Sequence, residues 1–176
     1  MKILIFLQGT ILMAKSGIGK TRQEIVEQAK AQDESIRDFG SYVPVRNAVQ
    51  KLKNWAEQGA TILYLSSLTE NKKARGDEIV GKEGLKMDQE VLDKYGFPKG
   101  EIYHRQNGES YAQIAEKIMP DILIEDDCES IGGEKEMTIT FIKPELRKQV
   151  KSVVIKEFGG IDHLPDDLSK LSKYGN

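Results

Sequence analysis

The chain opens on the stretch MKILIFLQGT (residues 1–10), an apolar run that stops at a Gly-Thr turn. A nearly continuous run of large apolar residues is typical of a strand buried on both faces, and such strands belong to parallel sheets that are covered by helices. We therefore expect a first central strand that delivers Gln8, Gly9 and Thr10 to one end of a sheet.

The remaining elements follow from apolar spacing. Helical periodicity predicts helices over residues 21–31, 47–58, 78–95, 110–119 and 166–171, and a polar helical turn over residues 33–44. Apolar and β-branched runs predict strands over residues 61–65, 101–105, 121–124 and 137–142. Two alternatives stay open for residues 144–156, either a helix that leads into a strand near residues 152–155 or one long helix.

Strands that alternate with helices imply parallel crossover connections. The expected architecture is a three-layer α/β/α fold with a mostly parallel, Rossmann-like sheet. A chain of 176 residues with 39% hydrophobic residues can build one well-covered core but not two ordinary domains. We therefore expect a single domain over residues 1–176.

The balance of charge limits the class of partner. The chain has 26 basic and 28 acidic residues, so its formal net charge of −2 provides no strong field for nucleic acid or an anionic membrane. Cys128 is the only cysteine, which excludes an internal disulfide and suits a reducing compartment. The opening apolar run lacks the features of a signal peptide and is too short to span a bilayer. The cytoplasm is the expected location.

Polar residues follow three of the predicted strands. In open α/β sheets, ligands bind beyond the carboxyl ends of the strands, where such residues gather. The residues at these three ends are Gln8, Gly9 and Thr10, then Ser66 and Ser67, and finally Glu125, Asp126 and Asp127.

Together, these three ends resemble motifs one, two and four of the haloacid dehalogenase (HAD) superfamily of phosphohydrolases. Residues 3–10 (ILIFLQGT) match the apolar lead and the Gly-Thr of motif one, Ser66 matches motif two, and Asp126 and Asp127 match the acidic pair of motif four. The resemblance covers most of the chain and implies a HAD-like domain with little or no cap. It also implies a Mg²⁺-assisted phosphoryl transfer, in which a first aspartate attacks phosphorus and a second moves the proton.

The sequence departs from this pattern at both motif-one aspartates. Phe6 stands at the position of the nucleophile and Gln8 at that of the acid and base. Phenylalanine cannot attack phosphorus, and a glutamine amide cannot shuttle a proton. Because the first carboxylate in the chain is Glu24, no shift of register restores the pattern.

Two further parts of the expected site are incomplete. The family has a phosphate-binding lysine at the start of the helix before the fourth strand, where residues 107–111 offer none, so Arg105 or Lys72 would have to replace it. Without the motif-one carboxylates, Asp126 and Asp127 would hold Mg²⁺ with fewer partners, and we expect weak or absent metal binding.

The sequence therefore predicts that a small phosphorylated or other anionic ligand is bound without hydrolysis, or that the domain has a regulatory role. The expected ligand-binding residues are Gln8, Gly9, Thr10, Ser66, Ser67 and Arg105. The alternative is an active Mg²⁺-dependent phosphatase or nucleotidase that recruits its carboxylates from elsewhere.

A third interpretation rests on the stretch AKSGIGKT (residues 14–21), which resembles a loose Walker A motif with alanine in place of the first glycine. In a P-loop, Lys20 would reach the phosphates and Thr21 would bind Mg²⁺. However, a P-loop springs directly from its strand, whereas the strong strand here ends at Leu7. We expect a glycine-rich flap instead, and we rank a P-loop nucleotide-binding protein third.

Overall fold

The computed structural model describes residues 1–73, 79–81, 86–106 and 108–174. Its centre is a five-stranded sheet with the order β5-β4-β1-β6-β7, in which every pairing is parallel. The strands are β1 (Lys2–Phe6), β4 (Thr61–Leu65), β5 (Ile102–Tyr103), β6 (Ile122–Asp126) and β7 (Lys151–Ile155). The three inner strands are almost continuously buried, as their apolar sequences predict.

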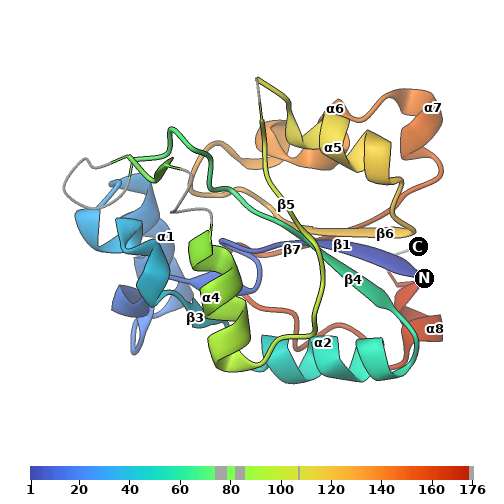
Figure 1. Cartoon of the computed structure of the whole chain (residues 1–176), viewed down its shortest axis with the longest axis horizontal. Coiled ribbons are helices and arrows are strands. Elements are labelled where there is room, and N and C mark those ends of the chain that lie inside the picture. Colours follow the sequence, from blue (N-terminus) through green and yellow to red (C-terminus); the bar gives the residue numbers. More distant parts are fainter. Residues whose placement is uncertain (74–78, 82–85, 107, 175–176) are drawn as a thin grey trace.

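Helices cover both faces of this sheet, which confirms the predicted three-layer, Rossmann-like α/β architecture (Figure 1). One face carries α2 (Ala48–Glu57), α4 (Lys86–Tyr95) and α8 (Leu168–Leu171). The other carries α5 (Tyr111–Ile118), α6 (Thr138–Phe141) and α7 (Pro144–Arg147). Each face has its own apolar cluster, because alternate residues of β1, such as Ile3 and Leu4, point to opposite sides.

The strand order determines where a ligand site can form. From β1 the chain moves outward through β4 to β5, and it then returns to the other side of β1 to form β6 and β7. The direction of winding reverses between β1 and β6, and open α/β sheets bind ligands at such a switch point. Because β4 and β6 both pair with β1, the three predicted polar ends lie at adjacent strands.

A segment inserted between β1 and α2 lies beyond the carboxyl ends of the strands (Figure 1). The helix predicted over residues 21–31 is confirmed as α1 (Arg22–Lys30). The polar helical turn predicted over residues 33–44 is in fact two 3-10 turns, Glu34–Arg37 and Phe39–Ser41, followed by β3 (Val43–Pro44). β3 pairs antiparallel with β2 (Leu12–Met13), and a 3-10 turn over Lys15–Gly17 follows β2.

The strand predicted over residues 137–142 is wrong, because this stretch forms the short helix α6. Its β-branched residues favour a strand, but the buried Glu125 carboxylate accepts hydrogen bonds from the backbone N–H groups of Thr138 (2.7 Å) and Ile139 (3.0 Å). N–H groups in the first turn of a helix have no acceptor within the helix. Here the Glu125 carboxylate provides one and stabilises the helical turn. The fifth strand is instead β7, so the first alternative for residues 144–156 is confirmed.

The other predicted elements are present, several of them shorter than expected. The strand predicted over residues 101–105 is reduced to the two residues of β5. Of the helix predicted over residues 78–95, the structure has α4, which begins at Lys86. Ile79 instead forms an isolated bridge with Lys73. Residues 78 and 82–85 lie outside the described ranges. Within those ranges, no helix has the length and apolar character needed to cross a bilayer.

Replacing Ser110 by alanine is expected to lower the free energy of unfolding by about 1 kcal/mol. Ser110 caps α5 through a capping box, in which its hydroxyl accepts from the Gln113 N–H and its own N–H donates to the Gln113 side chain. Urea unfolding would measure the change. Ser110→Thr keeps the hydroxyl and serves as the control, and equal losses in both variants would contradict the capping role.

Candidate functional site

The candidate site lies at the carboxyl ends of β1, β4 and β6. Directly after β1 the chain makes a tight turn, in which the N–H groups of Ile11 (3.0 Å) and Leu12 (2.8 Å) both donate to the carbonyl oxygen of Leu7. Gly9 occupies the left-handed region within this turn, with a φ of 85°, and its carbonyl oxygen accepts from Phe158 N–H at 2.6 Å. The turn directs the side chains of Gln8 and Thr10 toward the neighbouring strand ends.

Gln8 joins the ends of β1 and β4. Its Oε1 accepts from the backbone N–H of Ser67 (2.9 Å), and its Nε2 donates to Asp88 Oδ1 (2.8 Å). Ser66 Oγ donates to the other oxygen of Asp88 and accepts from Leu68 N–H (3.0 Å). The structure thus brings together three of the predicted residues, Gln8, Ser66 and Ser67, around a carboxylate that the motif comparison did not predict.

That carboxylate belongs to Asp88, in the first turn of α4. The residue is only 3% exposed, and burial raises the pKa of its carboxyl group to about 6, although the hydrogen bonds from Ser66 and Gln8 oppose the shift. Asp88, Val91 and Leu92 are the buried residues of α4, at positions i, i+3 and i+4. The sequence signal that could have identified Asp88 is therefore a charged residue on the apolar face of a predicted helix.

A second contact joins β1 to β6. Thr10 Oγ1 donates to Asp126 Oδ2 (2.9 Å), and the other oxygen of Asp126 accepts from Cys128 N–H (3.0 Å). Both Thr10 and Asp126 are buried, and burial raises the pKa of Asp126 to about 6 against the effect of these two hydrogen bonds. The predicted residues Thr10 and Asp126 therefore lie together at the switch point.

Asp127 does not join them. Its carboxylate accepts from Lys156 Nζ (2.8 Å) and from Glu157 N–H (3.0 Å), beyond the end of β7. Partial burial acts to raise the pKa of Asp127, but the hydrogen bonds from Lys156 and Glu157, together with the positive charges of Lys156 and Arg22, outweigh it and the pKa is lowered. The two adjacent aspartates thus have separate sets of partners.

These contacts use part of the acceptor capacity of both aspartates. Both oxygens of Asp126 and both of Asp127 already accept hydrogen bonds, and among the described residues no group of three or more His, Cys, Asp or Glu side chains could hold a metal. Each of these oxygens has a second lone pair, which a cation could use without displacing Thr10 or Lys156. Mg²⁺ binding at Asp126 and Asp127 stays a prediction.

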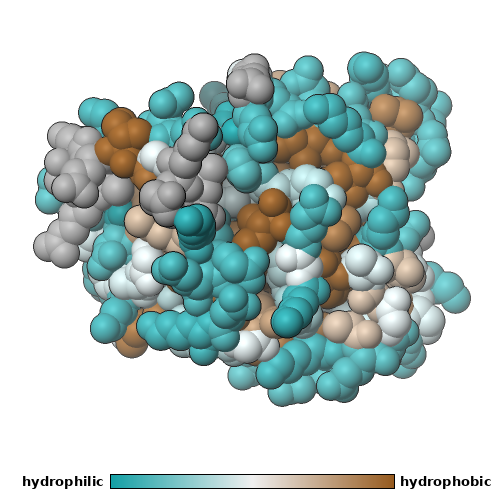
Figure 2. Space-filling model, viewed as in Figure 1, coloured by the Kyte–Doolittle hydropathy of each residue, from teal (hydrophilic) through white to brown (hydrophobic). Residues whose placement is uncertain are grey.

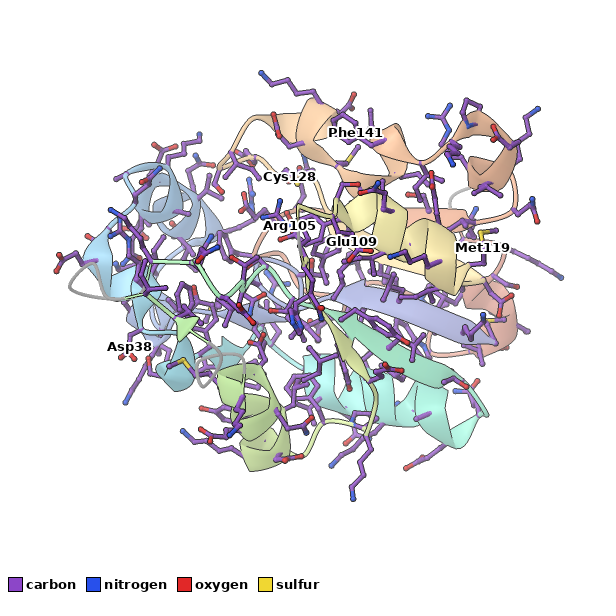
Figure 3. The ribbon with its side chains drawn as sticks, turned by 45° about the horizontal axis from the view of Figure 1, so that its top comes forward. Asp38, Arg105, Glu109, Met119, Cys128 and Phe141 are labelled. Carbon is purple, nitrogen blue, oxygen red and sulfur yellow. The ribbon has the colours of Figure 1, made fainter. Side chains whose placement is uncertain are left out.

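Phe6, at the position of the nucleophile in the HAD pattern, packs against an aromatic neighbour. Its ring lies 5.1 Å from that of Tyr111 in an edge-on arrangement, and the guanidinium of Arg105 lies 4.4 Å from the centre of the same Tyr111 ring. In Figure 3, Arg105 and Glu109 lie on the segment that joins β5 to α5, and Cys128 lies on the loop after β6. The structure therefore brings Arg105 to the same edge of the sheet as Phe6.

Arg105 belongs to a group of cations with Lys72 and Arg37. Although Lys72 is an exposed residue, the surrounding protein buries its ammonium group enough to lower its pKa, and the positive charges of Arg105 and Arg37 add to the effect. The positive charges of two residues from separate segments, Arg105 and Arg37, thus act on Lys72. Like charges that gather in this way attract an anion.

The residues of the Walker-like stretch are differently arranged. Thr21 is the N-cap of α1 and forms a capping box with Glu24, while Lys20 Nζ donates to the side chain of Gln28 (2.9 Å). The backbone N–H groups of Gly17 and Lys20 are bonded within the loop itself. Because these donors already have partners, the loop does not present the row of free N–H groups that cradles a phosphate.

A cavity of about 670 Å³ lies between the β5–α5 segment, α5 and α7, and Gln106, the chain neighbour of Arg105, is part of its wall. Charged side chains on its wall pair with one another, as in the ion pairs Lys117–Glu109 and Lys143–Glu116. Figure 2 shows a mostly hydrophilic face in which hydrophobic residues are visible between the two helical layers. At the strand ends, in contrast, the polar groups of Ser66, Asp88 and Asp126 are buried and have convergent contacts.

The stability of the protein is expected to fall as the pH rises through about 6. The pKa values of Asp88 and Asp126 are about 6 in the folded state and 3.8 in the reference state, so the folded state binds more protons between these values. Burial also raises the pKa values of Glu125 and Glu157, which contribute in the same direction. Urea unfolding at pH 5 and pH 8 would measure the difference, and Asp88→Asn should reduce it.

No protein-family model matches the chain, and no curated protein matches it either.

Proposed function

We propose that this chain is a HAD-like domain with a degenerate phosphohydrolase site, which binds a small phosphorylated or other anionic ligand without hydrolysing it, or which acts in regulation. One observation carries the proposal: Gln8 Nε2 and Ser66 Oγ, from adjacent strand ends, donate to one and the same carboxylate. Two convergent donors at the end of a parallel sheet are suited to an oxyanion.

The chemistry of motif one argues against aspartyl-phosphate catalysis. Phe6 has no nucleophilic atom, and its ring is packed against Tyr111. Gln8 uses both ends of its amide to connect Ser67 and Asp88, and an amide does not exchange a proton as a carboxyl group does. The residues at these two positions therefore support binding and not turnover. A cytoplasmic location, and the absence of nucleic-acid and membrane partners, also belong to the proposal.

Inorganic phosphate is expected to bind at the strand ends and to shift the amide NMR signals of Ser67 and Leu68. Arg105→Ala should weaken this binding by about tenfold or more, because a charge-assisted contact contributes about 1.5–3 kcal/mol. Arg147→Ala, on the exposed surface of α7, is the matched control. Signals that do not respond to phosphate, or equal affinities in all three proteins, would contradict the proposal.

The second candidate is an active Mg²⁺-dependent phosphatase or nucleotidase with non-standard residues. It is favoured by Asp88 and Asp126, two buried carboxyl groups with pKa values of about 6, in the range that suits a general acid or base. If this candidate is right, the protein releases phosphate from a phosphomonoester in the presence of Mg²⁺, and Asp126→Asn abolishes that release. A P-loop nucleotide-binding protein ranks third, since its support is limited to the glycine-rich sequence before α1.

A further inference from the structure

The side chain of Asp88 already occupies the position that the donors at the strand ends define. We call Gln8 Nε2 and Ser66 Oγ the donor pair. Each donates to a different oxygen of the Asp88 carboxylate, Gln8 at 2.8 Å. The carboxylate is therefore held as a bound oxyanion would be, by one neutral donor on each of its two oxygens.

The anchors of the donor pair lie just beyond the end of β4, whereas Asp88 comes from a covering helix. Gln8 is fixed by Ser67 N–H (2.9 Å) and Ser66 by Leu68 N–H (3.0 Å), so each member of the pair has a second contact that does not involve Asp88. Asp88 stands in the first turn of α4, which begins at Lys86. Removal of the carboxylate would thus leave the donor pair oriented by the ends of β1 and β4.

From this arrangement we infer that the donor pair is an oxyanion-binding site in which Asp88 is an internal competitor, so that a tetrahedral dianion such as phosphate or sulfate binds only by displacing the Asp88 side chain. The inference rests on the proposed function and specifies the residue that limits ligand affinity. Asp88 then determines how tightly the ligand binds, while Gln8 and Ser66 remain the groups that donate to it.

The charge of Asp88 and its contacts with both donors support competition between this carboxylate and a bound anion. The Asp88 carboxylate is 3% exposed, so water screens its charge little and an approaching anion would be repelled. The two donors are the only polar groups among the side-chain contacts that the described residues make with Asp88, and an anion needs the same two.

The test is a titration of four proteins with sodium sulfate at pH 7.5, with ionic strength held constant by sodium chloride. Sulfate is the probe because it does not titrate near this pH. The proteins are the unaltered chain, Asp88→Asn, Asp88→Ala and Asp93→Asn. Asp93 lies on the exposed side of α4 and provides the matched control. Binding is followed by the amide NMR signals of Ser67 and Leu68.

The inference predicts that Asp88→Asn and Asp88→Ala bind sulfate at least about tenfold more tightly than the unaltered chain and Asp93→Asn, since each removes the competing charge. The gain should disappear when Ser66→Ala is added to Asp88→Asn. Circular dichroism would show whether each variant is folded. Asparagine keeps the shape of Asp88 and can donate to Ser66 Oγ, so Asp88→Asn carries the test if Asp88→Ala fails to fold.

Two results would overturn the inference, and they have different meanings. Equal sulfate affinities in the unaltered chain and Asp88→Asn would show that Asp88 does not compete, while anion binding itself, and with it the proposed function, would stand. A failure of every protein to bind either sulfate or phosphate would remove the proposed function as well.

Discussion

Replacing Gln8 by aspartate, the residue that the HAD pattern has at this position, is expected to lower the free energy of unfolding by about 3 kcal/mol at pH 8. Gln8 Nε2 donates to the buried Asp88 carboxylate, and Gln8 Oε1 accepts from Ser67 N–H. Aspartate removes the donor and brings a second carboxylate toward the first. A lost hydrogen bond to a charged group costs about 1.5–3 kcal/mol, and like charges in a buried site add to that cost.

A double-mutant cycle distinguishes this cause from simple loss of packing. Asp88→Asn removes one of the two charges, so the pair Gln8→Asp and Asp88→Asn should recover about 2 kcal/mol relative to the sum of the single changes. The loss in Gln8→Asp should also be smaller at pH 5, where carboxyl groups with raised pKa values are protonated. Additive effects at pH 8 would mean that residues 8 and 88 are not coupled, contrary to the contacts described above.

Replacing Gly9 by alanine is expected to cost about 3 kcal/mol of stability. Gly9 has a φ of 85°, and a Cβ atom there would lie 2.7 Å from Asp126 Oδ2. The left-handed conformation alone costs about 1–2 kcal/mol in a residue with a Cβ atom. The remainder arises because Asp126 cannot move away without losing its hydrogen bond from Thr10 in a buried environment.

Gly19→Ala is the matched control for this prediction. Gly19 has a φ of 80°, but a Cβ atom there would meet nothing within 4 Å. It should therefore show only the conformational cost, about 1–2 kcal/mol. The difference between the two variants in urea unfolding measures the close approach of the β1 turn to Asp126, and equal losses would contradict it.

The sequence predicted the sheet well where burial alone determines structure. β1, β4 and β6 are central strands whose apolar runs allow few other structures, and the helices that cover them have clear periodicity. The prediction failed over residues 137–142, where β-branched residues adopt a helical turn because the distant Glu125 stabilises its N–H groups. Such a contact depends on the folded arrangement, and local propensity does not contain it.

The candidate site was only partly predictable for a similar reason. The strand-end rule correctly brought Gln8 to Ser66 and Ser67, and Thr10 to Asp126, because β1 pairs with both β4 and β6. Asp88 was missed since it comes from a helix and not from a strand end. The sequence grouped Asp127 with Asp126. Successive side chains of a strand point in different directions, however, and the Asp127 carboxylate contacts Lys156.

The buried carboxylate gives a physical reason for the amide at position 8. In the folded chain this position faces Asp88, where a donor is needed, and glutamine supplies one while aspartate would not. The departure from the HAD pattern at position 8 thus agrees with a strand end at which Gln8 and Ser66 donate to the Asp88 carboxylate.

Phosphorus-31 NMR of a phosphomonoester mixed with the protein and Mg²⁺ tests the central claim most directly, because one spectrum reports both binding and hydrolysis. The signal of the ester should broaden or shift in a saturable manner, and no signal of inorganic phosphate should grow with time. An inorganic phosphate signal that grows at a rate abolished by Asp126→Asn, or an ester signal that the protein leaves unchanged, would contradict the claim that this site binds an anion without hydrolysing it.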